Sequence, residues 1–235
     1  DKSDGSQIHT EGHTLTLTGA APKWYYLGVK FLDGGRIVIG STGKTLYYSN
    51  GADLGDASSE PFETADQTSF YWYNTPTPIA RPLQADGALT VDMTSNESAE
   101  NKFAILNTNT FTWAGDVVLN GASSSLNSRN SFSVSKFRSS EGRLVSHDVQ
   151  FSFLGDISGE GSVTVGHNTA IGSRSGWGRT YFGGHNTYTG TTTVYGSFST
   201  RLYAAYWDSI PDYSKTMIDS GYVAARLGTD GENEF

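Results

Sequence analysis

Apolar and polar residues alternate in short runs through most of this chain, and turn residues separate the runs. Residues 14–18 alternate threonine with leucine and end at Gly19, and similar runs occur at 36–39 and 88–93, each after an Asp-Gly turn signal. Alternation with this period places every second side chain on one face of a β-strand. No segment of about 12 residues or more keeps the period of an amphipathic helix. The pattern therefore predicts an all-β protein.

The second half of the chain continues in the same way. Short runs rich in valine, threonine and aromatic residues end at or just before glycines, at 116–119, 149–153, 162–165 and 191–195. These residue types favour strands, and the glycines favour the turns between them. The best helical candidates are short, at 97–106 and 204–209, and both fit loop turns equally well.

One stretch departs from this rhythm. Residues 53–82 contain Pro61, Pro76, Pro78 and Pro82 around an aromatic run at 70–73. Proline cannot donate a hydrogen bond to a ladder, so a regular strand is disfavoured here. We expect a long loop inserted between strands, and the aromatic residues favour an ordered one.

An internal repeat is the most informative feature of the sequence. Residues 111–117 align with 151–157, and a looser third copy follows at 186–192. Each copy places an aromatic residue two positions before a glycine, and a β-rich run follows. Glycine permits a corner, and the aromatic residue can stack on its equivalent in the next repeat. The repeat predicts stacked units with parallel strands, in which no unit buries its apolar face alone.

Residues 184–196 resemble the autotransporter-associated β-strand repeat of large bacterial surface proteins, whose Asn-Thr-Tyr-Thr-Gly hallmark stands at 186–190. Residues 155–165 are similar to the Gly-Asp-Ile-Ser-Gly stretch of that family. The resemblance covers roughly 111–228 and is most specific over 150–196. It implies a right-handed parallel β-helix (a β-solenoid) that is exported and then displayed or shed. It does not imply one activity.

These observations predict three regions. Residues 1–110 form a β-rich N-terminal part, either a cap or a small β-sandwich, and include the loop at 53–82. Residues 111–228 hold the solenoid repeats, and residues 229–235 are a linker-like tail. We expect the chain to be part of a larger protein. Exposed strand edges at the ends of a solenoid favour end-to-end or homo-oligomeric association.

Composition narrows the function classes. The 235 residues include no cysteine, so neither disulfides nor thiolate metal sites hold this fold. A formal net charge of −8 disfavours nucleic acid as a partner, and no apolar run is long enough to insert into a membrane. Few charges with many small polar and aromatic residues are typical of extracellular β-proteins. We therefore predict a secreted or cell-surface protein whose partners are glycans or host and cell-surface molecules.

Catalytic and metal-binding motifs are weak. His9 and His13 have the spacing of a helical metal pair, but their segment has a strand pattern, in which residues four apart lie about 13 Å apart. Residues 40–45 end like a phosphate-binding loop, but Val38 stands where its first glycine is needed. We predict no catalytic residue, no metal and no cofactor, and hence no enzyme.

Aromatic clusters are the best ligand candidates, because tryptophan and tyrosine rings stack on sugar faces. The residues singled out are Tyr71, Trp72, Tyr73, Trp24, Trp177 and Trp207. The alternative is that these rings fill the core and its corners. Two functions follow: a structural or adhesive solenoid segment of a bacterial surface or secreted protein, or a carbohydrate-binding module attached to a glycan-active enzyme.

Overall fold

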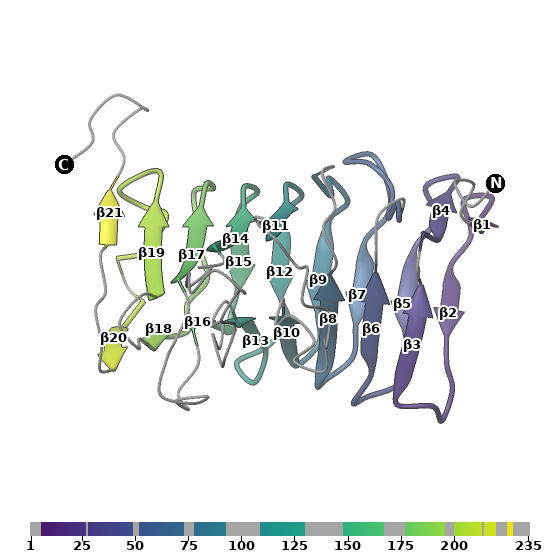
Figure 1. The fold of residues 1–235 in the computed structure, drawn as a ribbon, viewed down its shortest axis with the longest axis horizontal. Helices are drawn as coiled ribbons and strands as arrows, with labels where there is room; N and C mark the ends of the chain where they lie inside the picture. The colour runs from purple at the N-terminus through teal and green to yellow at the C-terminus, as the bar shows by residue number, and fades with distance from the viewer. Residues whose placement is uncertain are drawn as a thin grey trace, which may run out of the picture.

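The computed structural model describes residues 6–26, 28–48, 52–72, 78–92, 109–129, 148–166, 177–195, 200–212, 214–219 and 225–227. These residues form 21 β-strands and no helix, and the strands pair in parallel. The prediction of an all-β protein is therefore confirmed. The strands lie side by side along the long axis of the molecule, from β1 at one end to β21 at the other (Figure 1).

The strands belong to three long sheets and one short pair. The six-stranded sheet contains β2 (Leu15–Leu17), β5 (Ile37–Ile39), β7 (Phe62–Thr64), β9 (Leu83–Ala85), β12 (Val117–Leu119) and β15 (Ile157–Gly159). The eight-stranded sheet contains β3 (Lys23–Tyr26), β6 (Thr45–Tyr48), β8 (Thr68–Trp72), β10 (Ala88–Asp92), β13 (Ser125–Arg129), β16 (Ser162–Val165), β18 (Thr192–Tyr195) and β20 (Thr216–Asp219). The five-stranded sheet contains β11 (Asn109–Trp113), β14 (Asp148–Phe153), β17 (Trp177–Phe182), β19 (Thr200–Ala204) and β21 (Ala225–Leu227). The pair consists of β1 (Gln7–His9) and β4 (Lys30–Leu32).

The chain visits the sheets in a fixed order. From β11 in the five-stranded sheet it runs to β12 in the six-stranded sheet and β13 in the eight-stranded sheet, and then starts again at β14. We call one such traversal a pass. Before β11 a pass has strands only in the six-stranded and eight-stranded sheets, as in β5 and β6 or β7 and β8. Because strands of successive passes are neighbours within each sheet, every pass adds one layer of backbone hydrogen bonds along the long axis (Figure 1).

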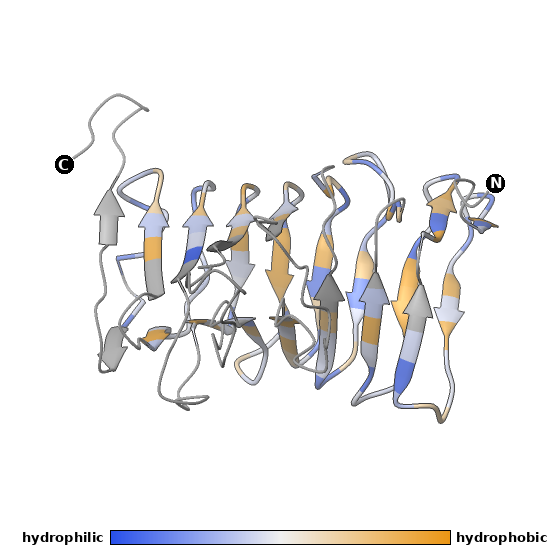
Figure 2. Ribbon diagram, in the orientation of Figure 1, coloured by the Kyte–Doolittle hydropathy of each residue, from blue (hydrophilic) through white to orange (hydrophobic). Residues whose placement is uncertain are grey.

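The core consists of side chains from alternate positions of the strands. In the six-stranded sheet, successive passes place fully buried residues in one register column: Ile37, Phe62, Leu83, Val117 and Ile157. The apolar stretches of these strands can be followed in Figure 2. Such columns explain the alternation in the sequence, because each inward side chain is covered by the equivalent side chain of the next pass.

The aromatic repeat is confirmed for its first two copies. Phe111 pairs with Phe151 and their ring centroids are 5.8 Å apart, so the spacing between these copies is the length of one pass. The third copy is wrong as aligned from the sequence, which sets Tyr188 against Phe153. In the structure Phe153 pairs with Phe182 instead, and the run at 186–190 follows the corner after that strand. The Asn-Thr-Tyr-Thr-Gly run therefore lies beside β15 of the six-stranded sheet, and not in the five-stranded sheet that contains the aromatic repeat.

Glycines form a column at the corner between the five-stranded and six-stranded sheets. Gly115, Gly155 and Gly184 come from three successive passes, and a Cβ on Gly155 would overlap the backbone carbonyl of Gly115. The same holds for a Cβ on Gly184 and the carbonyl of Gly155. Only glycine permits this approach of one backbone to the next. Gly115 and Gly155 thus have their expected role, while Gly184, and not the predicted Gly190, continues the column.

The expectation of an inserted loop at 53–82 is wrong for the residues described. This stretch contains β7, and β8 pairs on both sides, with β6 and with β10. Pro61 and Pro82 stand directly before β7 and β9, where their carbonyls accept ladder hydrogen bonds from Ile37 and Phe62. Proline is tolerated at the start of a strand, and the sequence argument gave that too little weight.

The N-terminal part is not a separate β-sandwich. β9 and β10, which lie before residue 110, pair in parallel with β12 and β13, which lie after it. Two of the sheets therefore continue across the predicted boundary, and parallel strands do not form an antiparallel sandwich. The helical candidate at 204–209 is the end of β19 and a turn, while the candidate at 97–106 lies outside the described residues. The tail at 229–235 also lies outside them.

Candidate functional site

The corner after β19 departs from the glycine column. Before the corner, Phe182 pairs with Ala204. After it, the Asn186 N–H donates to the Asp208 carbonyl, which in a parallel ladder places His185 level with Asp208. The later pass therefore uses one residue more than the earlier pass to cover the same corner. Tyr206 and Trp207 stand where the preceding pass has Gly184 alone.

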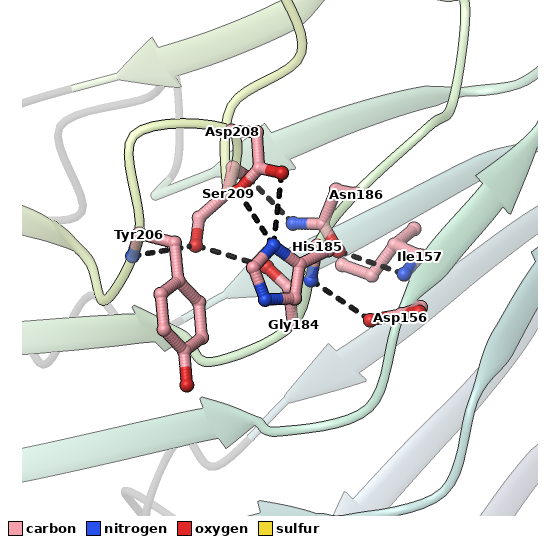
Figure 3. A network of polar contacts seen from close by, with 8 residues as sticks. All are labelled: Asp156, Ile157, Gly184, His185, Asn186, Tyr206, Asp208 and Ser209. Atoms are coloured by element: carbon pink, nitrogen blue, oxygen red, sulfur yellow. Dashed lines mark hydrogen bonds and ion pairs between the residues drawn. The ribbon is translucent and has the colours of Figure 1, made fainter.

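We call this region the Trp207 corner: residues 205–209 with His185, Asn186 and Asp156, which contact them directly or through one another (Figure 3). The Nδ1 atom of His185 lies 2.8 Å from each carboxylate oxygen of Asp208. The imidazole ring also stacks on Tyr206, with ring centroids 4.2 Å apart and planes 19° apart. The His185 ring is thus held from the side by a carboxylate and from one face by a phenol ring.

Buried hydrogen bonds support the corner from below. Ser209 donates from its hydroxyl to the Gly184 carbonyl (2.9 Å) and accepts from the Tyr206 N–H (3.0 Å). The side-chain amide of Asn186 donates to the Ser209 carbonyl and accepts from the Ile157 N–H (2.7 Å). Ser209 and Asn186 are both buried. These bonds attach the turn to the two preceding passes. Buried polar groups whose hydrogen bonds are satisfied hold a single arrangement.

The outer surface of the corner is aromatic and acidic. Trp207 is 73% exposed and Tyr206 is 43% exposed. Carboxylates of the earlier passes lead up to this turn: Asp116 accepts from the Asp156 N–H (3.0 Å), and Asp156 accepts from the His185 N–H (2.8 Å). An exposed indole next to carboxylates can stack on a sugar ring while the oxygens accept its hydroxyl hydrogen bonds.

The corner contains serine, histidine and aspartate, but their geometry is not that of a nucleophilic triad. The one hydroxyl proton of Ser209 is donated to a backbone carbonyl, and the side chain is buried, so it is not presented to a substrate. Within the described part of the chain, no group of three or more histidine, aspartate or glutamate side chains is placed to hold a metal ion.

The other predicted ligand residues lie elsewhere. Trp24 in β3 packs against the core, and the Lys44 ammonium lies 5.5 Å from its ring centroid. Lys44 also donates to the carbonyls of Ala20 and Ala21, between β2 and β3. Its ammonium therefore holds that turn rather than binding phosphate. Much of Trp24 is therefore occupied by its own protein.

The backbone positions of the remaining predicted residues are partly known. Tyr71 and Trp72 end β8 and pair with Tyr47 and Tyr48 of β6. Trp177 begins β17, far along the axis from β8 (Figure 1). Tyr73 lies outside the described residues. The structure therefore does not bring the predicted aromatic clusters together into one site, and Trp207 is the one whose exposed ring is described.

Sequence analysis missed a second polar centre, at Arg81. Its side chain is fully buried, and Nη1 donates to the carbonyls of Gly35 (2.7 Å) and Glu60 (3.0 Å). Burial lowers the pKa of the Arg81 guanidinium from its ordinary value, and the nearby carboxylates of Asp53, Asp56 and Glu60 act in the opposite direction. A lone arginine before a strand carries no signal of this role, because its partners lie in earlier passes.

Comparisons of the chain with models of known protein families, with curated proteins and with solved structures found no match. No helix long and apolar enough to cross a membrane occurs in the part of the chain that is described. The functional argument therefore rests on the arrangement of the sheets and on the geometry of the Trp207 corner.

Proposed function

We propose that this chain is a segment of a right-handed parallel β-helix, a β-solenoid, with a non-catalytic structural or adhesive role in a larger bacterial protein that is secreted or displayed at the cell surface. The observation that carries the proposal is the eight-stranded sheet, in which each pass adds one parallel strand. A protein built in this way extends along one axis and offers long side faces to partners. The resemblance of residues 184–196 to autotransporter-associated repeats supports the same role.

The acidic balance of the chain and its lack of cysteine agree with this proposal. Neither feature favours nucleic acid, and partners among glycans or host and cell-surface molecules remain the expectation. The strand edges of the end passes favour end-to-end or homo-oligomeric association. The engaged hydroxyl of Ser209 supports a non-catalytic role for the corner in which serine and histidine meet.

A turnover assay with adhesion as a second readout tests this proposal. The purified chain is incubated with a panel of soluble polysaccharides, and new reducing ends are measured. In parallel, beads coated with the chain are compared with albumin-coated beads for attachment to bacterial and epithelial cells. We expect no turnover. Turnover that a single carboxylate substitution such as Asp208→Asn abolishes would show that the chain is an enzyme.

A second candidate function is a carbohydrate-binding module of a glycan-active enzyme. The specific observation that favours it is the exposed indole of Trp207, which stands in the chain between the exposed Tyr206 and Asp208. Retention of the chain on polysaccharide gels separates the two functions, because the structural role does not need glycan binding.

A further inference from the structure

We propose that the Trp207 corner is a binding site for one ring of a neutral polysaccharide, with the Trp207 indole stacking on the sugar and the Asp208 carboxylate accepting its hydroxyl hydrogen bonds. This inference names the site and the ligand class of the second candidate function, and it rests on that function.

The first argument is that the aromatic pair is an addition to the repeated corner. Three passes close the corner with one glycine each, Gly115, Gly155 and Gly184, and the column they form packs backbone against backbone. The next pass uses Tyr206 and Trp207 at this place and lengthens the corner by one residue. Trp207 adds little to the core, since it is 73% exposed. Its indole is therefore available to stack on a ligand from solvent.

The second argument is that the corner is held in place before any ligand arrives. Ser209 fixes both the Tyr206 N–H and the Gly184 carbonyl, and Asn186 fixes the Ser209 carbonyl. One face of Tyr206 is covered by His185, which is itself held by Asp208 (Figure 3). A rigid turn loses little conformational entropy on binding, so an exposed ring on it contributes more of its stacking energy to affinity.

The third argument concerns charge and sets the ligand class. Asp116 and Asp156 lie one pass apart along the corner, His185 comes next and contacts Asp208, and the whole chain carries a formal net charge of −8. Uronic acids and sulfated sugars would meet these like charges, which disfavours them. Neutral sugars instead present hydroxyl donors. Each carboxylate oxygen accepts more than one hydrogen bond, so Asp208 can bind a hydroxyl while it holds His185.

Affinity electrophoresis of the full chain tests the proposal. Gels contain either a neutral polymer (hydroxyethylcellulose, xyloglucan, galactomannan or dextran) or an acidic one (polygalacturonate or alginate). We expect at least one neutral polymer to retard the wild-type chain, and Trp207→Ala to weaken that binding by about tenfold or more. Trp207→Phe, which keeps a stacking ring, should retain most of the binding.

Leu154→Ala is the matched control. Leu154 is an exposed apolar residue at the same corner, two passes before Trp207, but it has no ring to stack, so its removal should leave retardation unchanged. Both substitutions are at exposed positions, and equal thermal midpoints by circular dichroism will show that folding is intact.

Each result decides a separate point. If no polymer, neutral or acidic, retards the wild-type chain, this proposal and the second candidate function are both wrong, and the structural role is unaffected. If only acidic polymers retard it, the proposal is wrong and the second candidate function stands. If Trp207→Ala is retarded as strongly as the wild type, the chain binds glycans at another site and the proposal is wrong. If the acidic polymers bind as tightly as the neutral ones, the assigned ligand class is wrong.

Discussion

The Nη1 atom of Arg81 donates a hydrogen bond of 2.7 Å to the carbonyl oxygen of Gly35, which lies 46 residues earlier in the chain. The same nitrogen donates to the carbonyl of Glu60 in the pass between them. Arg81 stands in the corner column just before Gly115, whose backbone packs on the Arg81 carbonyl. One buried side chain therefore ties three consecutive passes together at this corner.

Replacing Arg81 by methionine should destabilise the chain by about 2–4 kcal/mol, because the buried Gly35 carbonyl and the partly buried Glu60 carbonyl both lose their donor. Urea denaturation should show a lower midpoint with an unchanged slope. Lys23→Met is the matched control, since it removes one positive charge at an exposed position of β3 and should cost no more than about 0.5 kcal/mol. Equal midpoints for the two variants would mean that the Arg81 bonds contribute nothing net.

The glycine column gives a prediction about steric fit. Gly155→Ala should destabilise the chain by about 1–3 kcal/mol, because the new methyl group overlaps the backbone of Gly115 and a backbone cannot swing aside as a side chain can. Gly19→Ala makes the same chemical change where the nearest atom, in the Trp24 ring, would be 3.5 Å away. It should change stability by about 0.5 kcal/mol or less. The thermal midpoints of the two variants give the comparison, and a tolerated Gly155→Ala would contradict the column.

Some features of this fold could be predicted from the sequence because they depend on neighbours in the chain. The alternation at 14–18 needs only local periodicity, and the repeat of Phe111 at Phe151 needs only a comparison of the chain with itself. Both correspond to paired strands in the structure. The prolines near β8 disfavour a strand only when their places in the ladder are ignored, and those places are set by other passes.

The role of Arg81 and the added residue at the Trp207 corner depend on another kind of information. Each is defined by which residue of a different pass lies opposite, and the passes differ in length. In the five-stranded sheet, the separation along the chain between paired residues shrinks from the β11–β14 pair to the β14–β17 pair, and again to the β17–β19 pair. Tyr206 and Trp207 were visible as aromatic residues, but their replacement of a corner glycine is visible only once the register is known.

Stability at high pH should depend on Tyr188. Burial raises the pKa of the Tyr188 hydroxyl to about 12, against an ordinary value of 10.0. The folded state therefore keeps this proton over a range in which the unfolded state has lost it. The contribution is fully present below pH 10 and is lost as the pH rises from 10 to about 12, by about 2–3 kcal/mol in total.

Tyr188→Phe removes this titration while keeping the ring. The free energy of unfolding of the variant, measured by urea denaturation at intervals from pH 9 to pH 12, should fall less steeply than that of the wild type. The two proteins differ only at this side chain, so the difference between the two curves isolates Tyr188. Parallel curves across this range would show that Tyr188 does not keep its proton in the folded state.

The side chain of Asn186 should stabilise the folded chain by joining the passes on either side of it. Its side chain bridges two passes: Oδ1 accepts from the Ile157 N–H, and Nδ2 donates to the Ser209 carbonyl. Asn186→Ala leaves both of these buried groups without their partner, which should cost about 2–4 kcal/mol.

Asn127→Ala is the matched control, because Asn127 is only half-buried and donates a longer bond of 3.3 Å to the Leu89 carbonyl. Urea denaturation of both variants should give a loss for Asn186→Ala at least twice that for Asn127→Ala. Equal losses would mean that the amide of Asn186 does not join the two passes, since a buried donor and acceptor left unpaired must cost more than a half-exposed one.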